Sequence, residues 1–239
     1  MPLTLTLLTL VVAFADWTAV ARRALDPASA GARRAEYVAK PLTMVALIAA
    51  ALASAHAHAA PGVPGPNRAT AYLVVATVAA LVLSAVGDVF LMLPEDSPSA
   101  DRNFVFGLAA FLLAHVAYIA AFVRLHTHGG YAISLFLTGL VLAGAVFATV
   151  GLRIRGAAGE EDPALAVPVL AYVTVISLLV VAAWWTGDLR IIPGALLFAA
   201  SDAMIGWTRF VRRDWELDVP IIVTYHLAQI LLVLGLVRR

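Results

Sequence analysis

The stretch TAYLVVATVAALVLSAVGDVFLML, residues 70–93, runs for 24 residues with a single charged side chain, Asp88. A helix of this length spans roughly 36 Å, enough to cross a hydrocarbon core about 30 Å thick. A carboxylate inside such a helix is costly, roughly 2.5–3.5 kcal/mol at the bilayer centre on insertion scales. The stretch therefore predicts a membrane-spanning helix and raises the question of what Asp88 does there.

The composition of the whole chain points the same way. Of its 239 residues 62% are hydrophobic and 13% charged, and the mean hydropathy is +0.93. Soluble domains carry about 25% charged residues, so most of this chain must face lipid. A net charge of +1 and the absence of a basic patch with interleaved aromatic residues argue against a nucleic-acid partner. With no cysteine, disulfides, thiolate metal ligands and cysteine nucleophiles are excluded.

Seven further apolar runs of similar length predict an all-α polytopic membrane bundle of about eight transmembrane helices. We expect residues 1–239 to form a single transmembrane domain. The segment Ala13-Phe14-Ala15 resembles a signal-peptide cleavage site, but no positive charge precedes it, so we expect the first span to be retained. The expected spans cover residues 3–21, 40–57, 70–93, 104–124, 131–151, 164–186, 189–210 and 217–237.

The Lys and Arg residues predict the orientation of the chain. Eleven of them fall on one side of the membrane in the eight-span arrangement and five on the other, and the richer side is expected to be cytoplasmic. Both termini then lie outside. Because the Ala-, Val- and Arg-rich composition suggests a bacterial source, we expect an integral protein of the inner (plasma) membrane. The eleven are Arg22, Arg23, Arg33, Arg34, Lys40, Arg102, Arg153, Arg155, Arg209, Arg212 and Arg213.

Polar side chains within the expected spans gather between the midplane and the cytoplasmic face. Helical spacing places them on shared faces, and intramembrane carboxylates are functional candidates by default. Asp88 and Asp202 are therefore the main candidates, whereas for Asp16 we expect a structural role, at a helix end or in an ion pair with Lys40. The shared faces comprise Thr77, Ser84, Gly87 and Asp88; Phe111, His115 and Tyr118; and Gly194, Phe198, Ser201 and Asp202. Tyr225, His226 and Gln229 occupy the first half of the last expected span.

Other familiar catalytic patterns are missing from the sequence. It contains no HExxH, GxSxG or phosphate-loop motif. The histidine pairs at 56–58 and 126–128 have i, i+2 spacing, and such residues point apart on a helix, so we expect no metal site there.

Five segments together resemble the YhhN-like lysoplasmalogenases. They are Lys40-Pro41, SAVGDVFLM (84–92), FGLAAFLLAHVAY (106–118), FAASDAMI (198–205) and YHLAQILLVLG (225–235). The resemblance implies an eight-span hydrolase that cleaves the vinyl ether bond of an alkenyl lysophospholipid into a fatty aldehyde and a glycerophospho-head group. It implies catalytic roles for two aspartates, together with membrane lipid and the lysophospholipid substrate as partners. The site residues carried over are Asp88 and Asp202 as catalytic, and Lys40, His115, Tyr118, Tyr225 and Gln229 as substrate-binding. Ser201, on the same face as Asp202, is also expected to bind substrate.

Vinyl ether hydrolysis suits a pair of carboxyl groups. One group protonates the β-carbon, and the other stabilises the resulting oxocarbenium ion and activates water. The sequence leaves open which aspartate is which. Lys40 is expected to bind the phosphate, no step requires a cofactor or a metal, and Tyr118, Tyr225 and Gln229 are expected to orient the ether oxygen or the water. Two alternatives remain: a proton-coupled transporter with a buried Asp/His relay, and a non-catalytic lipid-binding scaffold.

Overall fold

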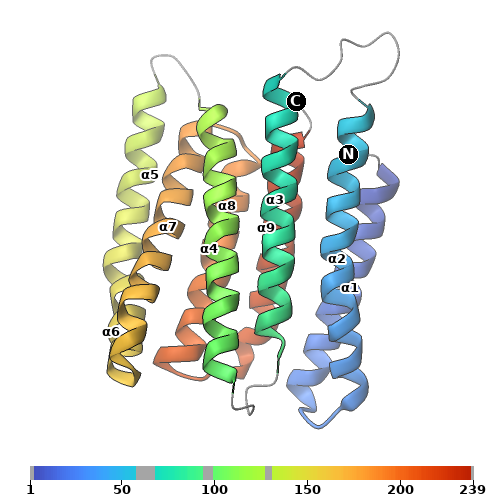
Figure 1. Cartoon of the computed structure of the whole chain (residues 1–239), viewed down its shortest axis with the longest axis vertical. Helices are drawn as coiled ribbons and strands as arrows, with labels where there is room; N and C mark the ends of the chain where they lie inside the picture. Colours follow the sequence, from blue (N-terminus) through green and yellow to red (C-terminus); the bar gives the residue numbers. More distant parts are fainter. Residues whose placement is uncertain (1–2, 58–67, 94–98, 127–130, 238–239) are drawn as a thin grey trace. The chain divides into compact units, whose positions relative to one another are not determined.

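The computed structural model describes residues 3–57, 68–93, 99–126 and 131–237, and every regular element within these ranges is a helix (Figure 1). The all-α prediction is confirmed. The elements are α1 (Leu3–Leu25), α2 (Ala30–Ala57), α3 (Arg68–Leu91), α4 (Ala100–Arg124), α5 (Ala132–Val146), η1 (Phe147–Gly151), α6 (Leu152–Glu161), η2 (Pro163–Leu165), α7 (Ala166–Thr186), α8 (Ile191–Gly206), η3 (Trp207–Val211), η4 (Trp215–Leu217) and α9 (Asp218–Val237).

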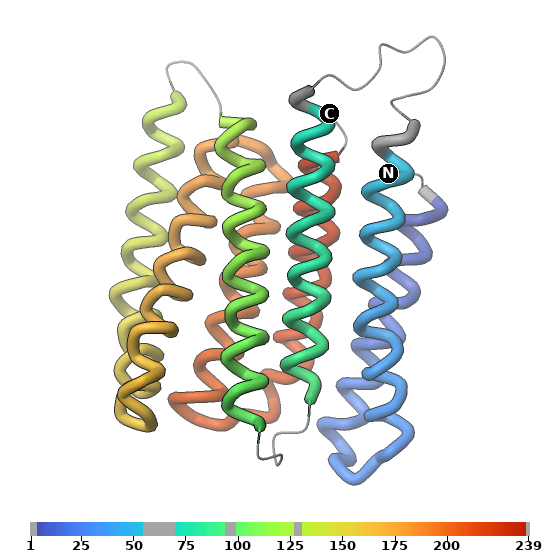
Figure 2. Tube along the Cα trace, in the orientation of Figure 1, coloured from blue at the N-terminus to red at the C-terminus, as the bar shows by residue number. Residues whose placement is uncertain are grey.

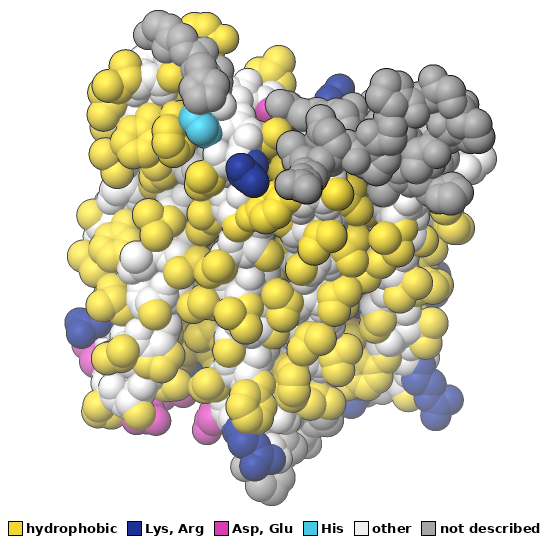
Figure 3. All heavy atoms as spheres, turned by 45° about the horizontal axis from the view of Figure 1, so that its top comes forward, with side chains coloured by type: hydrophobic (Ala, Val, Ile, Leu, Met, Phe, Trp, Pro, Cys, Tyr) yellow, Lys and Arg dark blue, Asp and Glu magenta, His cyan; other side chains and the backbone are white. Residues whose placement is uncertain are grey.

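Among the described residues, eight helical segments are long and apolar enough to cross a membrane, which confirms the expected number. On the face shown in Figure 3, hydrophobic side chains cover the lengths of the helices and charged side chains lie near helix ends. The segments are Thr4–Leu25, Ala30–Ser54, Thr70–Leu91, Ala100–Arg124, Ala132–Glu161, Pro163–Thr186, Ile191–Val211 and Trp215–Val237.

The helices fall into two compact units, residues 1–124 with 233–239, and residues 125–232. In the first unit, α1 packs against α2, α2 against α3, and α3 against α4 (Figure 2). In the second, α7 packs against α5, α6 and α8, and a buried cluster of Ala143, Val180 and Val181 lies between α5 and α7. Most of α9 belongs to the second unit.

Helix α2 begins at Ala30, ten residues before the expected start of the second span. Ser29 precedes it, and its hydroxyl accepts a bond from the Ala32 N–H at 3.4 Å, as an N-cap residue does. The Ala-rich segment that follows has a high helix propensity. Lys40 therefore does not open the helix: it is the eleventh residue of α2, and Pro41 lies in the helix interior, where membrane helices tolerate proline.

The fifth spanning segment is also longer than expected, because after η1 ends at Gly151 the helix continues as α6 to Glu161. Hydropathy indicates where a helix leaves the membrane, but it does not indicate where the backbone hydrogen bonds of that helix end. The charged segment 153–161 therefore stays helical. The helix ends at Asp162, whose backbone is extended (φ −147°, ψ 115°), as expected for a residue before proline. The Asp162 side chain accepts from the Ala164 N–H at 2.9 Å and caps η2.

Candidate active site

Asp88 lies near the C-terminal end of α3, which is the end that we expect to face the cytoplasm. Its side chain is buried, with the residue 2% exposed. Lys40 of α2 reaches it, with Nζ 3.7 Å from the Asp88 Oδ1 and a lysine side chain that is 16% exposed. This separation exceeds the 2.7–2.9 Å or so of a short charge-assisted hydrogen bond, so the pair is electrostatic and loose. The structure therefore brings together two residues that the sequence placed in one site.

Helix α4 packs against α3 at short range, next to the residue that precedes Asp88. A Cβ atom added at Gly87 would lie 2.5 Å from the Phe111 ring, and one at Gly107 would lie 2.8 Å from the Leu91 side chain. These two contacts define the antiparallel register of α3 and α4, in which His115 is level with residue 83. Along the helix axis His115 is thus about 7 Å, and Tyr118 about 12 Å, deeper than Asp88.

His115 and Tyr118 are both fully buried, at 0% exposure, and the Tyr118 ring stacks on Phe122 with a centroid distance of 6.1 Å. The predicted buried face of α4, with Phe111 on the same stripe, is confirmed. These residues line the packed α3–α4 contact one to two turns from the Asp88 carboxylate, so a role for them near Asp88 requires substrate to reach that depth.

Asp202 of α8 is 7% exposed and lies in the second unit. Tyr172 of α7 donates its hydroxyl to the Asp202 Oδ2 at 2.8 Å. The tyrosine is itself 7% exposed, so the hydrogen bond is buried between two helices. A neutral hydroxyl thus orients this carboxyl group, whereas a cation accompanies Asp88.

Ser201, Tyr225 and Gln229 are buried in the second unit, at 0%, 4% and 0% exposure. The Ser201 hydroxyl donates to the Ile221 carbonyl at 3.0 Å and links α8 to α9. The Tyr225 ring meets Phe198 edge-on, with centroids 5.6 Å apart. Ser201 therefore acts in helix packing in this structure, and Tyr225 lies beside the face of α8 that carries Asp202.

Sequence reasoning missed Tyr172. It lies in the middle of the apolar run AVPVLAYVTVISLL, residues 166–179, and its only signal is that a phenol buried in lipid needs a partner for its hydroxyl. The structure also buries Asp16 completely, at 0% exposure.

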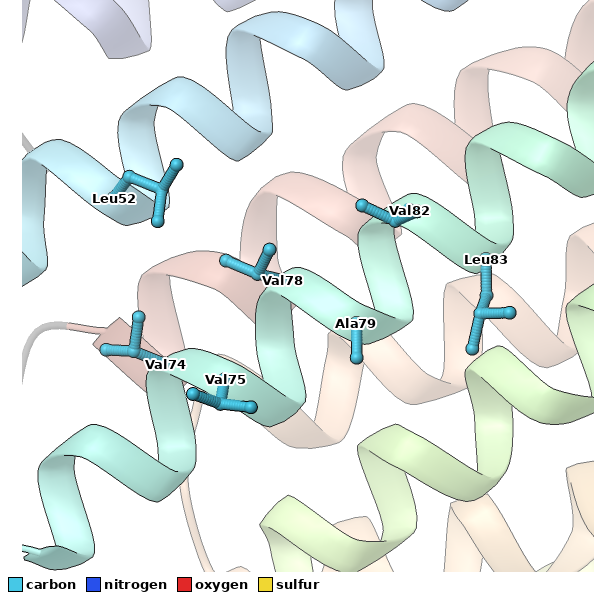
Figure 4. A pocket seen from close by; sticks show the side chains of 7 residues that line it. All are labelled: Leu52, Val74, Val75, Val78, Ala79, Val82 and Leu83. Atoms are coloured by element: carbon cyan, nitrogen blue, oxygen red, sulfur yellow. The ribbon is translucent and has the colours of Figure 1, made fainter.

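A groove of about 460 Å³ lies between α2 and α3 (Figure 4). Its lining is entirely apolar, with Leu52 from α2 and the rest from α3. Successive residues of a helix are 100° apart around its axis, so most of the groove-lining residues of α3 point more than 90° away from the direction of the Asp88 side chain. It is thus a lipid-facing surface separate from the Lys40–Asp88 pair. The α3 residues are Val74, Val75, Val78, Ala79, Val82 and Leu83.

Within the described ranges no group of three or more His, Asp or Glu side chains could hold a metal ion. Of the two histidine pairs, His58 and His128 lie outside the described residues. The His126 ring lies 4.6 Å from the Trp185 ring.

Comparison with known proteins gives one family. The model of the YhhN family matches residues 35–236. A lysoplasmalogenase of Mycobacterium bovis is 34% identical over 174 residues, covering 66% of this chain and 59% of that protein. The human lysoplasmalogenase TMEM86B is 32% identical over 162 residues, covering 66% and 62%, and its mouse counterpart is 31% identical over 161 residues, covering 67% and 62%.

The matched region thus spans about 59–62% of the length of these curated relatives. No solved structure matches the chain.

Proposed function

The chain belongs to the YhhN family, and from this we propose that it is a membrane hydrolase that cleaves the vinyl ether bond of alkenyl lysophospholipids. The observation that carries the proposal is the similarity to lysoplasmalogenases from both a bacterium and mammals. Two buried intramembrane aspartates, each with a polar partner from another helix, are compatible with this chemistry.

The reaction consumes one water molecule. A carboxylic acid transfers its proton to the β-carbon of the vinyl ether, and the ether oxygen shares the positive charge that develops on the adjacent carbon. Water adds to that carbon and loses a proton to a carboxylate, giving a hemiacetal. The hemiacetal collapses with cleavage of the carbon–oxygen bond, releasing a fatty aldehyde and the glycerol hydroxyl of the head group.

We assign the proton-donating role to Asp202 and the anionic role to Asp88. A neighbouring cation stabilises a carboxylate, and Lys40 lies 3.7 Å from Asp88. Asp202 is oriented by the uncharged Tyr172 hydroxyl. Asp88 then stabilises the oxocarbenium ion electrostatically, which is a large contribution in a site of low dielectric constant.

Lys40 has a second role in this proposal, as the group that binds the phosphate of the head group. Its side chain is partly exposed, and the loose contact with Asp88 leaves the ammonium able to interact with an incoming anion. We propose that the ether oxygen or the water is oriented by Tyr118, Tyr225 and Gln229. His115 is proposed to contact the substrate.

Purified protein in lipid nanodiscs should release aldehyde from 1-alkenyl-lysophosphatidylethanolamine. The 1-alkyl and 1-acyl analogues, which lack the vinyl ether, should yield none. Because no ion gradient exists in this assay, turnover distinguishes an enzyme from a proton-coupled transporter and from a lipid-binding scaffold. Absence of aldehyde with folded protein and every head group tried would contradict the proposal.

The two aspartates are tested by Asp88→Asn and Asp202→Asn, which keep the side-chain volume and remove the proton and the charge. General acid–base catalysis contributes roughly 10²–10⁴-fold, so each variant should lower kcat at least about 10²-fold. The double variant should be little worse than either single one, as for residues that act as a unit. Asp101→Asn, in the exposed first turn of α4, is the matched control. Turnover within a few-fold of wild type in a folded single variant would demote that aspartate to a structural role.

A further inference from the structure

A second ion pair lies beside the Lys40–Asp88 pair in the first unit. Arg23, near the end of α1, places its Nε 2.7 Å from the Glu36 Oε2 of α2. Glu36 and Lys40 are four residues apart on α2, and the side chains of such residues are neighbours on one helix face, with Cβ atoms about 5–6 Å apart. The two pairs therefore form one row of charges from α1 across α2 to α3. We call Arg23, Glu36, Lys40 and Asp88 the α1–α3 charge row.

The α1–α3 charge row becomes more buried along its length. Lys40 is about 6 Å further from the start of α2 than Glu36. The Arg23 side chain, beside Glu36, is 27% exposed, that of Lys40 is 16% exposed, and that of Asp88 is 3% exposed. A charged head group that approaches from the ends of these helices thus meets Arg23 and Lys40 before it meets Asp88.

Lys40 by itself is a poor site for a phosphate. It lies 3.7 Å from Asp88, and the negative charge of a carboxylate repels a phosphate, most strongly where the dielectric constant is low. In an alkenyl lysophospholipid the glycerol backbone separates the phosphate from the vinyl ether. The ether can therefore approach Asp88 while the phosphate is held further out, and the next cation outward in the row is Arg23.

We propose that Arg23 is a second phosphate-binding residue, which holds the head group together with Lys40, and that Glu36 positions the Arg23 guanidinium. A guanidinium has five N–H donors in a planar fork, so it can contact Glu36 through Nε and a phosphate oxygen through another nitrogen. The inference rests on the proposed function. It adds to the site a residue of α1, which lies outside the residues 35–236 that the family model matches.

Arg23→Gln should raise the KM for 1-alkenyl-lysophosphatidylethanolamine by about tenfold or more, the usual effect of losing a hydrogen bond between charged groups. It should leave kcat little changed, and it should leave the KM for 1-alkenylglycerol unchanged, because that substrate has the vinyl ether but no phosphate. Arg22→Gln is the matched control, since it removes the same charge at the exposed neighbouring position of α1 and should change neither KM. An unchanged KM for the phosphate-bearing substrate in Arg23→Gln, or an equal rise for both substrates, would overturn the proposal.

Glu36→Gln tests the positioning role. If Glu36 acts through Arg23, this substitution raises the KM for the phosphate-bearing substrate in the wild-type background but not in the Arg23→Gln background. A rise of equal size in both backgrounds would overturn the role given to Glu36. The double variant also replaces Arg23→Gln if that variant does not fold, because it leaves neither member of the pair as an unpaired charge.

A binding measurement without turnover separates this inference from the proposed function. The ligands are 1-alkyl-lysophosphatidylethanolamine, whose saturated ether is not cleaved, and 1-alkylglycerol, which lacks the phosphate. By calorimetry, Arg23→Gln should raise the Kd of the first ligand about tenfold and leave that of the second unchanged. If wild type hydrolyses no lysoplasmalogen but this difference is present, the phosphate site stands and the proposed reaction fails. Equal weakening of both ligands, or of neither, would overturn the inference even in an active enzyme.

Discussion

Two buried carboxyl groups in this chain have chemically different neighbours. Asp88 lies beside an ammonium group at 3.7 Å, and Asp202 accepts a hydrogen bond from a phenol at 2.8 Å. Ionised groups in a membrane interior are tolerated when they pair with one another, and a hydrogen bond from a phenol orients a carboxyl group without supplying charge. The two aspartates have the same side chain, so the chemical difference between the two positions comes from their neighbours, Lys40 and Tyr172.

Tyr172→Phe isolates the contribution of the phenol to Asp202. The substitution keeps the ring and removes only the hydroxyl that donates to Oδ2. A hydrogen bond of this kind is worth about 1 kcal/mol, and a loss of that size in the transition state corresponds to roughly fivefold to tenfold in kcat. We expect kcat to fall by about that factor in a protein that still purifies folded.

Tyr131→Phe is the control for Tyr172→Phe, because Tyr131 is 62% exposed. It should leave both kcat and Tm unchanged. Full kcat in Tyr172→Phe would show that the hydrogen bond to Asp202 has no part in turnover.

At the scale of the helices, glycines set the distance between α3 and α4. Gly87 immediately precedes Asp88, and a methyl group there would overlap the buried Phe111 ring at 2.5 Å. Small residues at such contacts let membrane helices approach closely, and dispersion forces then stabilise the pair. The position of the Asp88 carboxylate thus depends on a residue with no chemistry of its own.

Gly87→Ala should destabilise the protein by about 1–3 kcal/mol, because Phe111 or the helix must shift to admit the methyl group. Gly144→Ala, in α5, is the matched control, since nothing lies within 4 Å of an added Cβ there. It should be neutral or stabilise by up to about 1 kcal/mol, the usual gain for Gly→Ala in a helix. Thermal unfolding of both variants checks this, and an equal Tm for the two would contradict the close α3–α4 contact.

Helix ends in this chain follow local chemistry more than hydropathy. Gly187 has a left-handed backbone (φ 64°) that ends α7, and the Asp188 side chain accepts from the Arg190 N–H at 2.8 Å before α8 begins. Both residues are visible in the sequence as helix stop and start signals. The capped start of α2 at Ser29 was equally visible, but a search for apolar runs passes over it.

For the molecule as a whole, the eight spans and the distribution of Lys and Arg predict the topology. Because eleven of these residues fall on one side and five on the other, a reporter fused after Arg239 should indicate the non-cytoplasmic side. A reporter fused after Arg213 is the control and should indicate the cytoplasm. Cytoplasmic activity of both fusions would contradict either the number of spans or their orientation.

The sequence by itself determined the class of this protein, the number of its spans and the faces that are buried. These properties are local: hydropathy sums over about 20 neighbouring residues, and a period of 3.6 assigns each residue to a face. Thr77, Ser84, Asp88, His115 and Asp202 are all buried as their spacing predicted. The resemblance supplied the chemistry proposed for the two aspartates.

Only the tertiary structure decided the partners of the buried polar groups. Tyr172 of α7 lies 30 residues before Asp202 in the sequence and donates its hydroxyl to it, and Lys40 of α2 lies 3.7 Å from Asp88 of α3. A helical period says which residues point inward, but not which neighbouring helix they meet or at what depth. That choice depends on how the helices pack, which is set by close contacts such as those at Gly87 and Gly107.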